Sequence, residues 1–176
     1  MTEYFTDALV LDQEMSGEFD KIVYLYTKDF GKIAARAKSL RKITSKLAGH
    51  LEPLNFVKVR LVEKNGFQIV DALATVKFKK TTANLEACHF IKEMTFELQP
   101  DKKLWLVIKK NFKDFKDVKF SYKSLLEVLG FSSTFAKCQI CNKKSIAYFL
   151  IPDTVFLCRS CANNSKINKN ELIYIY

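Results

Sequence analysis

The sequence predicts an α+β protein in which a small β-barrel is followed by a helical domain that contains a four-cysteine metal site. Three observations support this fold class. Apolar and polar residues alternate in short runs through residues 1–80, and apolar residues recur at helical spacing after that point. Two Cys-x-x-Cys pairs lie near the end of the chain. We expect one domain at residues 1–80 and a second at residues 81–176, with the metal site at residues 138–161.

The first domain contains short strand candidates joined by turns. In the turn Lys28–Gly31, the glycine is suited to a positive φ angle, and Asn65-Gly66 is a dipeptide preferred in tight hairpins. About five hairpin-linked strands are typical of a small closed barrel, and we expect an OB-fold. The strand candidates are Phe5–Leu11, Ile22–Thr27, Lys32–Lys38, Leu54–Glu63, Phe67–Leu73 and Val76–Lys80.

The second domain is expected to begin with three helices. Pro100 closes the first, Asp101 is a suitable N-cap for the second, and the third covers Ser121–Leu129 with Gly130 as its C-terminal cap. We interpret the apolar stripes of the first two helices as core faces. Their members are Ala87, Ile91, Met94 and Leu98, then Leu104, Val107, Ile108, Phe112 and Phe115.

The composition is that of a basic globular protein. Hydrophobic residues make up 48% of the chain, and 29 Lys and Arg residues against 19 Asp and Glu residues give a formal net charge of +10. Such an excess favours a polyanionic partner, which charge alone does not identify among DNA, RNA and an anionic membrane surface. No apolar run approaches the roughly 18 to 20 residues that span a bilayer, and the first residues do not resemble a secretory signal. We therefore expect a cytoplasmic protein without a membrane partner.

Four of the five cysteines form a C-x2-C-x16-C-x2-C pattern. The members are Cys138, Cys141, Cys158 and Cys161. Two such pairs can complete a tetrahedron of sulfur ligands, and zinc is the ion best suited to it. Free thiols, two disulfides and an iron–sulfur cluster are the alternatives, but disulfides are disfavoured in a reducing cytoplasm.

The expected metal site is structural, with one Zn²⁺. Catalytic zinc keeps a coordination position open beside a proton-transferring residue, whereas four thiolates close the shell, and no His-x-Glu element accompanies them. Two short strands at residues 146–150 and 155–157 separate the cysteine pairs, as in a zinc ribbon. The fifth cysteine, Cys88, is expected to be a small buried apolar residue on a helix.

A basic segment follows the third strand candidate. Ile33, Ala35 and Ala37 alternate with polar residues, so cationic side chains should lie on the outer face of this strand and in the polar loop after it. OB-folds bind single strands with cationic grooves and aromatic platforms, but the sequence does not select a stacking residue. A merely solvated basic face is the alternative. The candidate DNA-binding residues are Lys32, Arg36, Lys38, Arg41, Lys42 and Lys46.

Several short segments occur in a particular order along the chain. A Gly-Glu-x-Asp loop precedes the second strand candidate, the basic strand and loop follow, and Leu-Glu-Pro-Leu comes next. The segments are Thr6–Leu11, Gly17–Val23, Gly31–Lys38, Arg41–Lys42, Leu51–Leu54 and, just before the first cysteine pair, Leu125–Phe131. As an ordered set covering about residues 5–161, they resemble the RecO family of bacterial DNA repair and recombination proteins.

The resemblance implies an OB-fold, a helical domain with an embedded zinc site, and no catalytic residues. It also implies binding to single- and double-stranded DNA, annealing of complementary strands, and help in loading recombinase onto strands coated by single-strand-binding protein, in the RecF pathway. The implied partners are DNA, RecR and single-strand-binding protein, with no small-molecule substrate, and the implied location is the cytoplasm in association with the nucleoid.

Two other classes of function remain open at this point. An OB-fold and zinc-ribbon RNA-binding factor of the translation machinery would have a similar charge and fold, and it would prefer structured RNA to DNA. A small zinc hydrolase or deaminase would need an open metal site and a general base, and the sequence offers neither at a suitable spacing.

Overall fold

The computed structural model of the 176-residue chain describes residues 2–114 and 120–175. The chain forms two compact units, Met1–Lys102 and Lys103–Tyr176. The sheet of the first unit ends at Lys77, close to the expected domain boundary at residue 80, but the unit itself continues to Lys102 because the next helix packs on the sheet. Among the described helices, none is long and apolar enough to cross a membrane.

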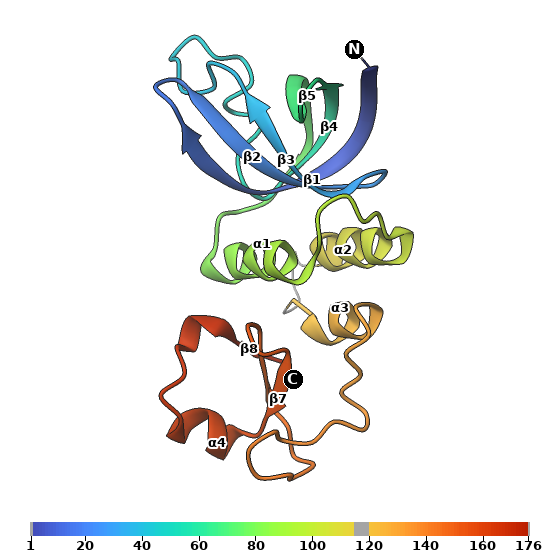
Figure 1. The fold of residues 1–176 in the computed structure, drawn as a ribbon, viewed down its shortest axis with the longest axis vertical. Helices are drawn as coiled ribbons and strands as arrows, with labels where there is room; N and C mark the ends of the chain where they lie inside the picture. The colour runs from blue at the N-terminus through green and yellow to red at the C-terminus, as the bar shows by residue number, and fades with distance from the viewer. Residues whose placement is uncertain (1, 115–119, 176) are drawn as a thin grey trace. The chain divides into compact units, whose positions relative to one another are not determined.

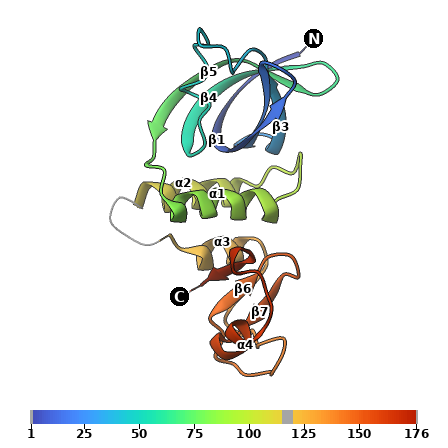
Figure 2. The same ribbon diagram turned by 90° about the vertical axis from the view of Figure 1, so that its left-hand side faces the viewer.

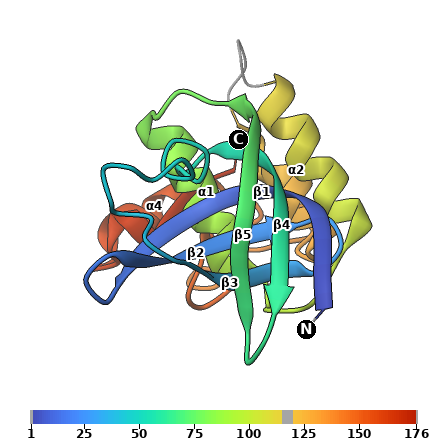
Figure 3. The ribbon, with the colours of Figure 1, turned by 90° about the horizontal axis from the view of Figure 1, so that it is seen from above.

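Five strands form a closed barrel in the order β1-β2-β3-β5-β4, which confirms the predicted OB-fold (Figures 1 and 3). Neighbouring strands are antiparallel except β3 and β5, whose parallel pairing closes the barrel. Alternate residues of β3 are buried, so the predicted inward face is confirmed. The strands are β1 (Thr2–Ser16), β2 (Asp20–Thr27), β3 (Gly31–Ala37), β4 (Asn55–Glu63) and β5 (Phe67–Lys77).

The two last strand candidates of the first domain are one strand in the structure, so the prediction of a separate strand at Val76–Lys80 was wrong. The pairing register of β4 and β5 shifts between Phe56 and Val57, whose partners are Val76 and Ala74. The side chain of Thr75, which lies between those partners, donates a hydrogen bond to the Phe56 carbonyl at 3.1 Å. This β-bulge interrupts the alternation of polar and apolar residues without ending the strand.

The turn before β3 requires glycine for two reasons. Gly31 has a φ angle of +69°, which side chains disfavour, and a Cβ atom built there would lie 2.3 Å from the Gln99 carbonyl oxygen. The Leu98 N–H also donates to the Lys32 carbonyl at 2.9 Å. The segment after the first helix therefore packs directly on the turn.

Helix α1 (Thr82–Met94) lies against one end of the barrel (Figures 1 and 2). Cys88 points to the barrel with 1% of its surface exposed, and burial raises the pKa of its thiol to about 12, so it is an unreactive core residue as expected. Lys92 fixes the helix by contacting the carboxylates of Asp12 at 2.8 Å and Glu14 at 3.2 Å, and its ammonium lies 4.0 Å from the centre of the Tyr24 ring.

The first helix ends earlier than the sequence predicted. Pro100 was expected to close it, with Leu98 on its core face, but Thr95 caps it and donates its hydroxyl to the Ile91 carbonyl at 2.6 Å. Leu98 has a φ angle of +56° and is 61% exposed. The chain leaves the helical path here because residue 97 forms a parallel bridge with Lys32 instead.

The second unit contains the second and third of the three predicted helices and a small sheet. Helix α2 (Lys102–Asp114) begins directly after Asp101, and α3 (Tyr122–Val128) is followed by Gly130 at a φ angle of +92°, as predicted for a C-terminal cap. Leu104, Ile108 and Phe112 are buried as expected, whereas Phe115 of the predicted stripe lies outside the described residues.

A three-stranded sheet in the order β7-β6-β8 forms the C-terminal part of this unit. The two predicted ribbon strands are present, and β8 is an addition that the sequence did not indicate, because three residues after a polar stretch carry too little alternation. The elements are β6 (Tyr148–Leu150), β7 (Val155–Leu157), α4 (Arg159–Asn164), η1 (Lys169–Glu171) and β8 (Leu172–Tyr174). We call residues 138–175 the cysteine module.

Candidate nucleic-acid interface and metal centre

The connection that follows β3 is attached to the barrel through Asp20, the first residue of β2. The Asp20 carboxylate accepts hydrogen bonds from the Ser39 N–H at 2.7 Å and from the Arg36 guanidinium at 2.9 Å. These two donors, the backbone one first, hold the pKa of Asp20 below its usual range. Ser39 itself has a φ angle of +53°. We call residues 38–46 the basic loop; its first turn is therefore ordered by a specific carboxylate.

A second attachment joins the basic loop to the turn between β1 and β2. The Arg41 N–H donates to the Phe19 carbonyl at 3.0 Å, and the Arg41 guanidinium donates to the Glu18 carbonyl at 2.9 Å. The Lys42 ammonium lies 5.3 Å from the centre of the Phe19 ring, and Phe19 is 42% exposed. An exposed aromatic ring and a set of cations thus lie together on the outside of the barrel.

The sequence contains several aromatic residues in the first domain and does not indicate which of them lies beside the basic loop; in the structure it is Phe19. Phe19 lies in the turn between two strands and outside any run of alternating apolar and polar residues. Its position in a turn was therefore the one sequence feature that could have predicted an exposed ring. Its position beside the basic loop depends on contacts with Arg41 and Lys42, more than twenty residues away in the chain. Only the structure brings these residues together.

Five of the six candidate DNA-binding side chains are exposed in this region. Lys32 differs from them: it is half-buried, and its ammonium donates a hydrogen bond to the Lys92 carbonyl of α1 at 2.7 Å. The structure therefore gives Lys32 a contact that joins the helix to the barrel. Residues 36–46 contain no acidic residue. The exposed candidates are Arg36, Lys38, Arg41, Lys42 and Lys46.

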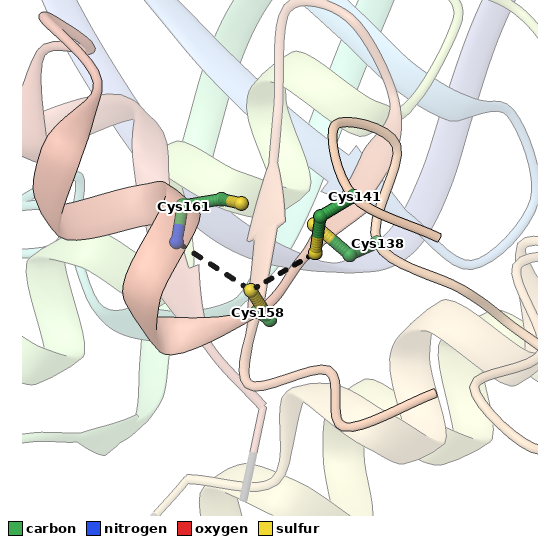
Figure 4. Close-up of side chains that lie close together, drawn as sticks. All are labelled: Cys138, Cys141, Cys158 and Cys161. Carbon is green, nitrogen blue, oxygen red and sulfur yellow. Dashed lines mark hydrogen bonds between the residues drawn. The ribbon is translucent and has the colours of Figure 1, made fainter. Parts of the chain in front are cut away.

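The four cysteines of the predicted metal site converge on one point (Figure 4). Their sulfur atoms all lie within 4.8 Å of one another, and the Sγ atoms of Cys141 and Cys158 are 3.7 Å apart. Sulfur ligands about 2.3 Å from a tetrahedral ion are separated by roughly 3.8 Å, whereas a disulfide bond measures about 2.05 Å. The arrangement can therefore hold one metal ion and is compatible with zinc.

Two tight turns aim these sulfur atoms. In the first, the Asn142 N–H donates to the Cys138 carbonyl at 2.9 Å, and Asn142 has a φ angle of +59°. In the second, Cys158 caps α4, and its sulfur accepts the Cys161 N–H at 3.4 Å. Each turn places two sulfur atoms on the same side of the backbone, which is the geometry that the Cys-x-x-Cys spacing predicts.

Hydrogen bonding prepares one thiol of the centre for metal binding. Burial raises the pKa of Cys138, but hydrogen bonds from the backbone N–H groups of Cys158, Cys141 and Ile140 outweigh burial and lower it to about 6. Hydrogen bonds with the sulfur atoms of Cys158 and Cys141 raise the pKa of Cys161 to about 12. A dication would favour the thiolate form of every ligand, since a coordinating thiol loses its proton.

The fold and the two candidate sites define the class of protein: an OB-fold protein with a separate four-cysteine metal module. Residues 1–78 match the family model described as Recombination protein O N terminal. The chain is 26% identical to the DNA repair protein RecO of Caldanaerobacter subterraneus subsp. tengcongensis, an alignment that covers 97% of this chain and 77% of that protein. It is 26% identical to RecO of Dehalococcoides mccartyi over 92% of this chain and 71% of the relative.

A shorter alignment shows higher identity. RecO of Myxococcus xanthus is 42% identical over 66 residues, which cover 38% of this chain and 27% of that protein. These similarities support assignment of the chain to the RecO family of DNA repair proteins. These similarities do not favour the interpretation as a translation factor.

Proposed function

We propose that this protein is a non-enzymatic mediator of DNA repair and homologous recombination. Similarity to the RecO family supports a role in DNA repair and recombination. In our proposal the protein binds single- and double-stranded DNA, anneals complementary strands, and helps to load recombinase onto strands coated by single-strand-binding protein, in the RecF pathway. Its protein partners would be RecR and single-strand-binding protein. It would act in the cytoplasm at the nucleoid, on no small-molecule substrate and no membrane.

The single observation that carries DNA binding is the ordered, exposed basic loop on the barrel. Asp20 and the backbone around Phe19 hold this loop in place, so less conformational entropy is lost when a ligand binds. Its cations offer phosphate contacts, and Ser39 and Thr44 add hydroxyl groups. Phe19 offers a ring face on which a base can stack. Cations beside an exposed aromatic ring are the combination that OB-folds use for single strands.

We assign Lys32 a different role from the other five candidate residues. Lys32 donates to the Lys92 carbonyl, so we propose that it supports the barrel–helix contact and not the DNA contact. Arg36 is paired with Asp20, and its side chain is still 55% exposed, so it can reach a phosphate as well. The proposed DNA-binding set is Arg36, Lys38, Arg41, Lys42 and Lys46, with Phe19 as the stacking residue.

Annealing follows from the electrostatics of this surface. Two DNA strands repel each other through their phosphates, and cations on a protein surface reduce that repulsion while releasing counterions. None of the proposed contacts reads a base edge, so binding should be independent of sequence. Affinity should fall steeply as the salt concentration rises.

We propose that Cys138, Cys141, Cys158 and Cys161 bind one structural Zn²⁺. Zinc would supply a fixed tetrahedral centre that joins the two turns and the short strands between them. The four thiolates leave no coordination position for water or a substrate, which fits a structural role. The chain's own contribution is to aim the sulfur atoms and to donate backbone hydrogen bonds to them.

The variant Arg36→Ala/Arg41→Ala/Lys42→Ala tests the DNA-binding site. We expect weaker binding to labelled single-stranded DNA and a smaller salt dependence, because up to three phosphate contacts are lost. Each lost contact should reduce the slope of log K against log salt by about 0.7 for a single strand. The measurement is fluorescence anisotropy across a salt series.

A matched control removes three positive charges elsewhere on the same unit. Lys64→Ala/Lys77→Ala/Lys79→Ala changes exposed lysines outside the basic loop and gives the same net charge. If both triple variants bind with the same affinity and slope, general charge explains binding and the basic loop is not the site.

A further inference from the structure

The cysteine module contains a basic hollow next to the metal centre. Its volume is about 350 Å³, and all of its lining residues belong to the second unit. Lys143 and Arg159 supply two positive charges, and Ser145 and Ser160 supply two hydroxyl groups. These four residues are exposed, and the half-buried Tyr174 also lines the hollow. No carboxylate is among the lining residues.

A second hollow, on the barrel, differs from the basic hollow in its balance of charges. That hollow has a similar volume of about 380 Å³ but is lined by three cations and three aspartates. Its formal charges therefore cancel, whereas the hollow in the cysteine module has a formal charge of +2 from Lys143 and Arg159. An anion gains a favourable interaction only in the second case.

The backbone beneath the basic hollow is well ordered by hydrogen bonds. The Ala147 N–H donates to the Leu157 carbonyl at 2.9 Å, and the Ala147 carbonyl accepts from the Ile175 N–H at 3.1 Å. The cationic residues are close in sequence to metal ligands, since Arg159 follows Cys158 and Lys143 lies two positions after Cys141. Metal binding at the cysteines would therefore also fix the spacing of the two cations.

We propose that this hollow binds a phosphate group of a nucleic-acid strand and is a second DNA contact, separate from the basic loop. A guanidinium binds phosphate oxygens in a bidentate manner, an ammonium adds a point charge, and serine hydroxyls donate further hydrogen bonds. The ring of Tyr174 offers an apolar surface to the adjoining sugar or base. The proposal rests on the proposed DNA-binding function and gives the chain two contact points for polynucleotide strands.

A different role for the same cations is the main rival. Four thiolates around one Zn²⁺ carry a formal charge of −2, and Lys143 and Arg159 would be suitable counterions for it. In that case their removal would weaken zinc binding and leave the DNA affinity of the zinc-loaded protein unchanged. Zinc retention must therefore be measured together with DNA binding.

The test compares two double variants of the zinc-loaded full chain. Lys143→Ala/Arg159→Ala removes the cations of the hollow, and Lys166→Ala/Lys169→Ala removes two exposed lysines of the same module that do not line it. The probe is a labelled oligothymidine bound across a salt series. We expect the first variant to reduce the salt slope by about 1.4, the value for two lost phosphate contacts, and to retain its zinc. The second variant should change the slope much less.

Equal slopes for the two variants would overturn the proposal, and so would a loss of zinc without a loss of DNA affinity. A second probe separates this outcome from a failure of the proposed function. Inorganic phosphate should shift the amide resonances of Ser145, Arg159 and Ser160 in the unaltered protein, whereas the amides at positions 145, 159 and 160 should not shift in Lys143→Ala/Arg159→Ala. If the unaltered chain binds no DNA, the proposed function fails, while absent phosphate shifts contradict the hollow as an anion site.

Discussion

The barrel and the cysteine module are stabilised in different ways. Fourteen buried apolar residues fill the barrel interior, from Ala8 in β1 to Ala72 in β5. The corresponding cluster of the cysteine module contains five buried residues, and two of them, Cys138 and Cys158, are candidate metal ligands. Burial of apolar surface can therefore stabilise the barrel without a ligand, whereas we expect the stability of the cysteine module to depend on a bound metal ion as well.

The two regions also present their basic residues differently. On the barrel, a carboxylate and backbone carbonyl groups order the basic loop. In the cysteine module, the cations of the hollow are adjacent or nearly adjacent in sequence to the candidate metal ligands. Loss of zinc should therefore affect DNA contacts of the module and leave those of the barrel intact.

Removal of zinc should produce the largest difference in stability between the cysteine module and the barrel. We expect chelation, or Cys141→Ser, to unfold the cysteine module, because structural zinc contributes about 10 to 16 kcal/mol of apparent binding free energy in small zinc domains. Hydrogen exchange should show lost protection in β6 and β7 and unchanged protection in β2 and β4. Cys88→Ala is the matched control, since Cys88 is buried on α1 of the first unit and is not a member of the four-cysteine cluster. Identical melting of the metal-free and zinc-loaded proteins would contradict a structural metal.

A substitution at the turn before β3 tests how much the close packing at Gly31 contributes to the stability of the first unit. Gly31→Ala should destabilise the first unit by at least about 2 kcal/mol, because left-handed backbone strain adds to a clash with the Gln99 carbonyl. Gly17 has a similar φ angle of +71°, but apart from Gly17 itself and its two chain neighbours no described heavy atom lies within 4 Å of the position that a Cβ would take, so Gly17→Ala should cost only about 1 kcal/mol. Hydrogen exchange of barrel amides at several denaturant concentrations measures the loss of unfolding free energy in both variants. Equal costs would show that the close approach of Gln99 is not important.

The smallest effect is expected for the exposed ring beside the basic loop. Phe19→Ala should leave barrel stability unchanged and weaken single-strand binding by about 1 kcal/mol, the lower end of the range for one base stacked on an aromatic residue. Phe19→Tyr should bind normally. The control is Phe5→Ala, which removes an exposed ring beside Arg60 on the barrel. If Phe5→Ala weakens binding as much as Phe19→Ala, stacking on Phe19 is not supported.

Local signals account for what the sequence predicted. Alternation of apolar and polar residues identified β3, the Asn65-Gly66 pair marked the hairpin between β4 and β5, and the cysteine spacing identified the four residues whose sulfur atoms converge. Each of these patterns depends on residues that are near one another in the chain. Period, turn chemistry and ligand spacing are therefore sufficient to predict them.

Contacts between distant residues account for what the sequence did not predict. The ammonium of Lys32 binds a carbonyl sixty positions later, and Phe19 gains its cationic neighbour from the basic loop. Residue 97 leaves the helical path because it pairs with β3. Such pairings depend on how the chain closes in three dimensions, which periodicity does not report. The outer-face position of Lys32 was correctly predicted, but its hydrogen-bond partner was not predictable.

Annealing of two complementary labelled oligonucleotides, with and without the protein across a salt series, tests the proposed role most directly. We expect the protein to accelerate annealing, the acceleration to fade as salt rises, and Arg36→Ala/Arg41→Ala/Lys42→Ala to reduce it. No acceleration, together with tighter binding to structured RNA than to DNA, would contradict a role in DNA strand annealing and support an RNA-binding factor instead.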